Sequence, residues 1–268
     1  MEARAGIAPL ARFWMALRHA QDGHLPYQRY HQAGLRRAAR GCTVSQVEAS
    51  VRDWIGTDLN PAVQAIRLAT SYEAVVQGFN AYNQASSKAV NTQVEWKKGA
   101  AGFNYVARRK LLQTEVDPEP CRMGTLAMVQ WLFADVGRRQ AAEGLSVGEV
   151  AQRLAVQSTA SAQAAEVFER RGNITIPELA RELGCGQRTL ERRLKQEGGS
   201  AEVLRASTRL VAATRALTSS MSLTEIAFET GFSDSAHMSR AFKAACGMSP
   251  SVLRRTVSAP PEAARSDH

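Results

Sequence analysis

The chain has 268 residues, of which 44% are hydrophobic and 22% charged, and its formal net charge at pH 7 is +9. This length suffices for one large or two ordinary hydrophobic cores, and the composition, without low-complexity tracts, indicates a globular protein. The excess charge comes mainly from arginine and favours an anionic partner, either nucleic acid or an acidic membrane surface. No apolar stretch is long enough to cross a bilayer and no signal peptide is evident, so we expect a cytoplasmic protein.

The cysteine and histidine residues are not spaced as metal ligands. Cys42, Cys121, Cys185 and Cys246 lie far apart without a C-x-x-C pair, and the five histidines show no ligand spacing. No glycine-rich phosphate-binding loop is present. We therefore expect reduced thiols, no metal and no cofactor.

The N-terminal half predicts helices and one small antiparallel sheet. Its first sixty residues fit no pattern that we can assign. Apolar residues at helical spacing predict helices near residues 72–82 and 123–138. Alternating apolar residues predict a hairpin with strands at 91–96 and 103–107, joined by a glycine-rich turn.

Five aromatic residues of this half could line an apolar effector pocket or belong to the hydrophobic core: Trp96, Phe103, Tyr105, Trp131 and Phe133. Strand and helix spacing of this kind is more typical of core residues, so we favour the core.

Residues 144–148, GLSVG, match the G-x-S-x-G pattern of a serine-hydrolase nucleophile elbow. That motif requires a strand before the serine, whereas residues 137–143 have a polar, helical pattern. We therefore predict no hydrolase site and no catalytic residue.

Three ten-residue windows align without gaps: SVGEVAQRLA (146–155), TIPELARELG (175–184) and SLTEIAFETG (222–231). Each begins with a Ser or Thr that can cap a helix and has Glu three positions later, the capping-box arrangement. In the second and third windows a glycine closes the helix, and its left-handed conformation lets another helix leave steeply. These two windows predict helix-turn-helix units. The first window lacks the glycine and a basic helix after it, so we expect an ordinary capped helix there.

A helix with one apolar and one outward face follows each closing glycine. In CGQRTLERRLKQEG (185–198), Leu190 and Leu194 are expected to face the core. In FSDSAHMSRAFKAACG (232–247), the core-facing residues are expected to be Phe232, Met238 and Phe242.

Two stretches of the C-terminal part together resemble one known family. GFSDSAHMSRAFKAACGMSPSVLR (231–254) resembles the C-terminal signature of the AraC/XylS family of transcriptional regulators, and LARELGCGQRTLERRLKQEG (179–198) resembles its first helix-turn-helix. The resemblance extends over residues 165–255. Small departures occur at Met238, Cys246 and Leu253, none of them on the outward faces.

The resemblance implies an all-α DNA-binding domain at residues 159–258, with two helix-turn-helix units joined by a linker helix. Members of the family commonly carry an effector-binding or dimerisation domain ahead of it, which we assign to residues 1–158 as an α+β domain. The tail, residues 259–268, is predicted to be disordered. A linker helix of about sixteen residues is a rod of roughly 24 Å, which with its turns could place the two units about one B-DNA turn, ~34 Å, apart.

Carried over residue by residue, the resemblance implies DNA contacts on the second helix of each unit. Arginine can bind guanine as a fork, Glu can accept from cytosine N4, and a small apolar side chain can meet a thymine methyl group. The expected base contacts are Arg188, Glu191, Arg192, Ala236, His237 and Arg240. The expected phosphate contacts are Thr189, Lys195, Ser239 and Lys243.

These patterns predict a regulator of transcription that binds double-stranded DNA sequence-specifically and inserts two recognition helices into successive major grooves. RNA polymerase, a small-molecule effector and a second copy of the chain are further candidate partners, and no membrane partner is expected. Two alternatives stay open: a DNA-repair-type enzyme fused to the same module, and an all-helical interaction module. The enzyme would need a cysteine site in the first half, where only Cys42 and Cys121 occur. The interaction module would show no salt-dependent duplex binding.

Overall fold

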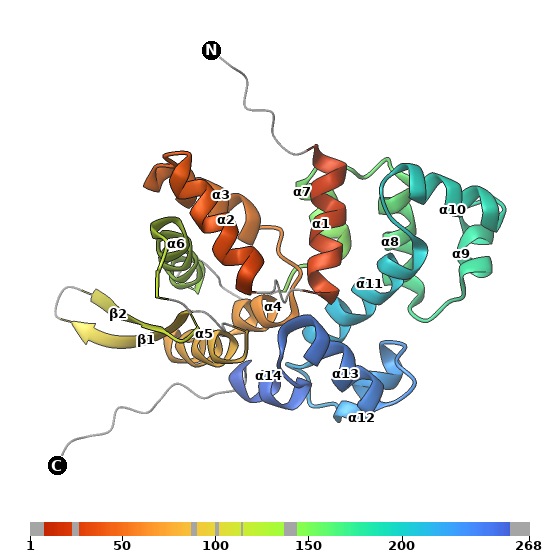
Figure 1. Ribbon diagram of the computed structural model, residues 1–268. Coiled ribbons are helices and arrows are strands. Elements are labelled where there is room, and N and C mark those ends of the chain that lie inside the picture. Colours follow the sequence, from red (N-terminus) through yellow and green to blue (C-terminus); the bar gives the residue numbers. More distant parts are fainter. Residues whose placement is uncertain are drawn as a thin grey trace.

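The computed structural model describes residues 8–22, 27–86, 90–99, 102–113, 115–136 and 144–257. These residues form fourteen helices and one two-stranded antiparallel sheet, which confirms the predicted fold class (Figure 1). The predicted disorder of the tail and the roles considered for the Trp96 and Phe103 side chains fall outside this described part. Within it, no helix is both long and apolar enough to cross a membrane.

In chain order the elements are α1 (Pro9–Gln21), α2 (Tyr27–Ala39), α3 (Val44–Ile55), α4 (Pro61–Leu68), α5 (Tyr72–Ser86), β1 (Val90–Gly99), β2 (Gly102–Leu111), α6 (Glu119–Val136), α7 (Val147–Arg153), α8 (Ala160–Arg171), α9 (Ile176–Glu182), α10 (Gln187–Gln196), α11 (Ala201–Ala216), α12 (Leu223–Glu229), α13 (Ser235–Cys246) and α14 (Pro250–Val257). In Figure 1 the hairpin, α2, α3, α5 and α6 form one side of the molecule and α8–α13 the other, with α1 and α4 between them.

The hairpin is supported by α5, which covers the outer edge of β1. The strands pair in antiparallel register up to Gly99 opposite Gly102, so the predicted strands are confirmed and extend into the predicted turn. On α5, Asn80 binds both backbone groups of Val94: its Nδ2 donates to the carbonyl oxygen at 2.9 Å and its Oδ1 accepts from the amide at 2.7 Å. This side chain takes the place of a neighbouring strand and removes part of the unpaired edge that β1 would expose.

Aromatic residues of the N-terminal half pack together rather than around a pocket. Phe133 stacks on Tyr72 and on Tyr105, with ring centroids 5.6 and 5.3 Å apart. The Arg67 guanidinium lies over the Trp131 ring, 5.2 Å from its centroid, which covers that ring with a cation. Tyr105, Trp131 and Phe133 therefore belong to the core cluster of this half, as the spacing predicts.

α1 contributes to the core of the first helix-turn-helix unit. Phe13, Trp14 and Leu17 repeat at helical spacing and are at most 1% exposed. They lie in one hydrophobic cluster with Leu190 and Leu194 of α10. The first sixty residues, which no sequence pattern assigned, thus supply a helix that packs directly against the C-terminal part.

α4 has the same relation to the second unit. Ala65 and Leu68 of α4 lie in one cluster with Met238 and Phe242 of α13. Asn60, which caps α4 by accepting from the Ala62 amide, also donates to the carbonyl oxygen of Ala245 at 2.9 Å. Residues on both sides of position 158 therefore build both cores.

The turn between α10 and α11 fits closely around Trp14. A Cβ atom on Gly199 would lie 2.0 Å from the Trp14 ring, far inside van der Waals contact. Arg18 of α1 donates to the carbonyl oxygen of the adjacent Gly198. Glycine at position 199 is needed because the indole occupies the space of any side chain.

We expect Gly199→Ala to destabilise the protein by about 1–3 kcal/mol, because the methyl group must displace the buried Trp14 ring. Urea unfolding followed by circular dichroism measures this change. Gly124→Ala is the matched control: its Cβ meets only Val47 and Val51 at 3.8 Å, so in the interior of α6 it should raise stability by up to about 1 kcal/mol. Equal effects of the two substitutions would contradict the tight fit at Trp14.

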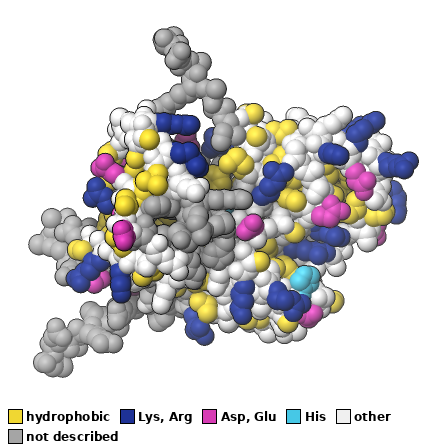
Figure 2. Space-filling view, in the orientation of Figure 1, with side chains coloured by type: hydrophobic (Ala, Val, Ile, Leu, Met, Phe, Trp, Pro, Cys, Tyr) yellow, Lys and Arg dark blue, Asp and Glu magenta, His cyan; other side chains and the backbone are white. Residues whose placement is uncertain are grey.

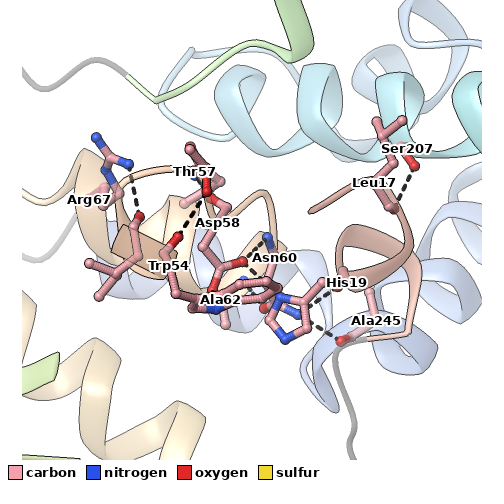
Figure 3. Close-up of polar contacts among 12 residues, drawn as sticks. Leu17, His19, Trp54, Thr57, Asp58, Asn60, Ala62, Arg67, Ser207 and Ala245 are labelled. Atoms are coloured by element: carbon pink, nitrogen blue, oxygen red, sulfur yellow. Dashed lines mark hydrogen bonds and ion pairs between the residues drawn. The ribbon is translucent and has the colours of Figure 1, made fainter. Parts of the chain in front are cut away.

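A buried polar network joins α1 to the segment before α4 (Figure 3). His19 Nδ1 lies 2.8 Å from Asp58 Oδ1, and Trp54 Nε1 donates to Asp58 Oδ2 at 3.1 Å. Burial lowers the pKa of His19, but the Asp58 charge, the hydrogen bond to it and the Asp22 charge outweigh burial and raise that pKa above its ordinary value. The fold thus favours the imidazolium form of His19.

We expect the stabilisation from the His19–Asp58 pair to depend on pH. Because the folded state raises the pKa of His19, its contribution is complete below the unfolded pKa of about 6.5 and is lost as pH rises through the raised pKa. His19→Gln should therefore lose more unfolding free energy at about pH 6 than at about pH 9. Asp58→Asn removes the charge partner, so that burial lowers the pKa of His19 and the loss of stability with rising pH should disappear. A wild-type–variant difference that stays constant across the range would contradict the ion pair.

Candidate nucleic-acid interface

Two helix-turn-helix units are built on the same local geometry. In each, a Ser or Thr caps the first helix reciprocally with Glu, as Thr175 does with Glu178 before α9 and Ser222 does with Glu225 before α12. These hydrogen bonds hold the pKa of both glutamates below the ordinary value. The predicted capping boxes are therefore present at both units.

The turn after each first helix also repeats. The glycines at 184 and 231 have φ of +64° and +83°, the left-handed conformation predicted for them. The residue after each glycine donates its amide to the alanine carbonyl of the first helix, Cys185 to Ala180 at 3.0 Å and Phe232 to Ala227 at 2.8 Å. This bond closes the first helix and directs the second away from it.

The window at 146–155 forms the same turn, which the sequence analysis did not expect. Ala155, a non-glycine residue, has φ of +55°, and Val156 donates to the Ala151 carbonyl oxygen at 2.9 Å. Ser146, the serine of the G-x-S-x-G match, caps α7 reciprocally with Glu149. The prediction of a capped helix is confirmed, but the missing glycine does not prevent the turn, so α7 and α8 form a third helix-turn-helix geometry.

The first turn of α8, the second helix of this third unit, is in contact with another part of the protein. A recognition helix would need that turn exposed to DNA. The carboxylate of Glu197, after α10, accepts from the amides of Ala160 and Ser161 at 2.8 Å each. The first turn of α8 is therefore capped by another unit of the protein, and α8 serves as a packing helix.

We expect Ala155→Gly to raise the unfolding free energy by up to about 1 kcal/mol, since glycine adopts positive φ without the steric cost of Cβ. The reciprocal change, Gly184→Ala, places Cβ in open space and should lower stability by about 1 kcal/mol through backbone strain alone. Chemical denaturation measures the change in unfolding free energy of each variant. Destabilisation by Ala155→Gly would contradict the left-handed turn at that position.

The predicted residues of the first unit lie on the outward face of α10. Burial of Leu190 and Leu194 turns the opposite face to solvent. The Glu191 carboxylate accepts from Gln187 Nε2 at 2.7 Å, so Gln187 sets the direction in which that carboxylate reaches. The exposed residues of this face are Arg188, Glu191, Arg192 and Lys195, with Thr189 half-buried among them. Arg193 is also exposed, at a position that the sequence analysis did not include among the expected contacts.

The outward face of α13 begins at a strong cap. Asp234 accepts from the His237 amide at 2.6 Å, and this bond, with one from Ser233, holds the pKa of Asp234 below its ordinary value. The His237 ring packs edge-on to Phe232 at 5.3 Å, and its Nδ1 lies 3.1 Å from Ser233 Oγ, which leaves Nε2 to reach outward. The predicted residues of this face are exposed or half-buried: Ala236, His237, Ser239, Arg240 and Lys243.

α11 joins the two units as a rod of 16 residues, as the sequence predicts. Its Arg209 donates through Nη2 to Asn173 in the turn before α9. Arg209 also lies against the turn of the second unit, since a Cβ atom on Gly231 would lie 2.9 Å from Nε of Arg209. One side chain thus contacts both units, and the arginines of α11 are functional candidates that the sequence analysis missed.

Three further features of the C-terminal part are its surface charge, the packing of α14 and its metal-ligand content. Figure 2 shows Lys and Arg side chains along the end of the molecule formed by α9 and α10. α14 begins at Pro250 and buries Leu253 in the cluster of the second unit, so it supports that unit from outside the turn. Among the residues that the structure describes, no group of three or more His, Cys, Asp or Glu side chains is placed to hold a metal ion.

A comparison with known protein families supports the helix-turn-helix fold of the C-terminal part. Residues 179–256 match a protein family described as a helix-turn-helix domain. The match includes α10 through α13 and covers less than a third of the chain, so it characterises that part only. A search of curated proteins finds no match. Among solved structures, the transcriptional regulator CdpR from Pseudomonas aeruginosa is similar at 14% identity over 92% of this chain and 96% of that chain, with a TM-score of 0.35. A similarity this low carries no argument about function.

Proposed function

We propose that the protein is a sequence-specific, double-stranded DNA-binding regulator of transcription of the AraC/XylS type. The observation that carries the proposal is the pair of equivalent helix-turn-helix units, each with a basic outward face on its second helix, joined by α11. In this proposal α10 and α13 are the recognition helices. The net charge of +9 supplies the sequence-independent attraction to the duplex.

The proposed base contacts follow from the chemistry of the two faces. Arg192 and Arg240 are exposed and pair with no acid among the described residues, so each guanidinium is free to fork onto guanine O6 and N7. Arg188, Glu191, Ala236 and His237 complete the proposed base-reading set. Thr189, Lys195, Ser239 and Lys243 are proposed to hold phosphates and to fix each helix in its groove.

Insertion into successive major grooves is proposed from the length of α11. Sixteen helical residues give a rod of roughly 24 Å, and with the flanking turns the recognition helices could reach sites about 34 Å apart. A single chain would then contact one face of the duplex twice. Dimeric helix-turn-helix proteins need two subunits for the same reach.

The division of roles between residues 1–158 and 159–258 is also a proposal. We assign effector binding or dimerisation to the first part, with RNA polymerase as a further candidate partner of the second. Because α1 and α4 complete the cores of both reading units, a change in the first part can act on α10 and α13 through direct packing. This route gives the proposed control a physical basis.

The proposal predicts that Arg192→Ala and Arg240→Ala each weaken binding to the preferred duplex by about 1–3 kcal/mol and relax base preference at one position. The preferred duplex is first selected from a random pool with the wild-type protein, and anisotropy titrations then compare variants. Lys195→Ala should instead weaken all duplexes alike and reduce the slope of log K against log salt by about one.

Arg108→Ala is the matched control, because it removes one exposed arginine from β2, at the opposite side of the molecule from α10 in Figure 1. It should leave base preference unchanged. If Arg192→Ala and Arg240→Ala both keep the full selectivity of the wild type, α10 and α13 are not the recognition helices.

A further inference from the structure

A pocket of ≈ 270 Å³ lies against α11, between the end of α8 and the end of α12. Its lining includes Gly172 after α8, Thr208 of α11 and Thr230 after α12. Pockets for drug-sized ligands have volumes of about 300–1,000 Å³, so this pocket suits a smaller ligand. A molecule bound in it would contact α8, α11 and the end of α12 at once.

The pocket is lined by three arginines of α11: Arg205, Arg209 and Arg215. None of them forms an ion pair with an acidic side chain in the described part of the chain. The Nε atom of Arg209 is buried and has no hydrogen-bond partner there. A buried N–H donor of a charged group is costly when unpaired, so this site has a donor that lacks an acceptor.

Arg205 and Arg209 are four residues apart and therefore lie on the same face of α11. Burial, and after it the charge of Arg205, lowers the pKa of Arg209, which shows that the two guanidinium groups repel each other in a partly desolvated site. A bound anion would relieve this repulsion.

The acidic residues of the pocket do not supply that anion. Glu169 is engaged elsewhere: its Oε1 accepts from the amides of Val147 and Gly148 at 2.6 and 3.2 Å and caps α7. Glu229 lies at the exposed end of α12 and forms no ion pair with a described basic residue. Burial raises the pKa of Glu169 and the Arg215 charge acts against this rise, so Arg215 is partly compensated by that carboxyl. The positive charge of Arg205 and Arg209 is left for a ligand.

We infer that this pocket binds a phosphate group, held by the guanidinium groups of Arg205, Arg209 and Arg215. Arginine suits this ligand because its planar fork donates two parallel hydrogen bonds to phosphate oxygens. The phosphate could belong to the DNA backbone between the two grooves or to a free phosphate ester. The first source rests on the proposed function, whereas the second does not.

A phosphate in this position would also bind Arg209, the side chain that lies between the turns of the two units. Arg209 already contacts Asn173 of the first unit and the Gly231 turn of the second. A ligand on the same side chain would restrict the rotation of one unit relative to the other. It would thereby select the arrangement in which α10 and α13 are held for reading.

The test uses the full-length protein in a phosphate-free buffer and two arms. In the first arm, duplex binding is measured against salt concentration for wild type, Arg205→Gln, Arg215→Gln and the control Arg108→Gln. In the second arm, inorganic phosphate is titrated and the thermal unfolding midpoint of the same four proteins is followed. Circular dichroism spectra verify that each variant is folded, and Arg205→Lys tests whether charge alone restores the effect.

A backbone phosphate predicts that Arg205→Gln and Arg215→Gln each reduce the slope of log K against log salt by about one, while Arg108→Gln does not. A free phosphate ester predicts that inorganic phosphate raises the unfolding midpoint of wild type and Arg108→Gln but not of the two pocket variants. Two results together overturn the inference. Phosphate would raise the unfolding midpoint of wild type no more than that of the pocket variants, and the pocket variants would bind the duplex with the same salt dependence as Arg108→Gln. A wild type that binds no duplex refutes the proposed function alone, because the phosphate titration still reports on the pocket.

Discussion

The orientation of the two outward helix faces depends on how α11 is held. Ser207 Oγ, in the middle of this helix, donates to the Leu17 carbonyl oxygen at 2.7 Å and accepts from Gln21 Nε2 at 2.7 Å. These bonds hold α11 against α1, while Arg209 contacts both helix-turn-helix units. Displacing α11 from α1 would leave these buried polar groups unpaired, which is more costly than losing exposed contacts. The placement of the two outward faces therefore depends on α11 and α1 together.

The parts of the fold that could be predicted from the sequence are those specified by residues close together in the chain. Capping boxes, closing glycines and apolar residues at i and i+4 act over a few positions, and so Thr175, Gly184 and Leu190 sufficed to place the first unit. The hairpin was predicted for the same reason, since strand alternation and a turn are local signals. The outward positions of Arg192 and Arg240 followed directly from the inward positions of their neighbours.

The contacts between distant segments could not be predicted in this way. The spacing of Phe13, Trp14 and Leu17 indicates an apolar helix face, but no nearby residue indicates that this face packs against the α10–α11 turn. The His19–Asp58 pair likewise joins residues whose burial becomes known only when α1 and α4 are packed. Long-range contacts are chosen by shape and by the satisfaction of buried polar groups, and both depend on the assembled molecule.

The turn after α7 shows that helix-turn-helix geometry alone does not leave the second helix open to DNA. Ala155 forms the turn at positive φ, so glycine lowers the cost of this geometry but is not required for it. The difference lies at the start of the second helix. α8 is capped by its own Thr159, as α13 is by Asp234. In addition, Glu197 from another unit binds the Ala160 and Ser161 amides of α8, whereas Gly186 before α10 has open space around it. A helix can enter a groove with its first turn only if no other element covers that turn. The contact of another unit with the first turn of the second helix therefore distinguishes α8 from α10 and α13, which the turn alone does not.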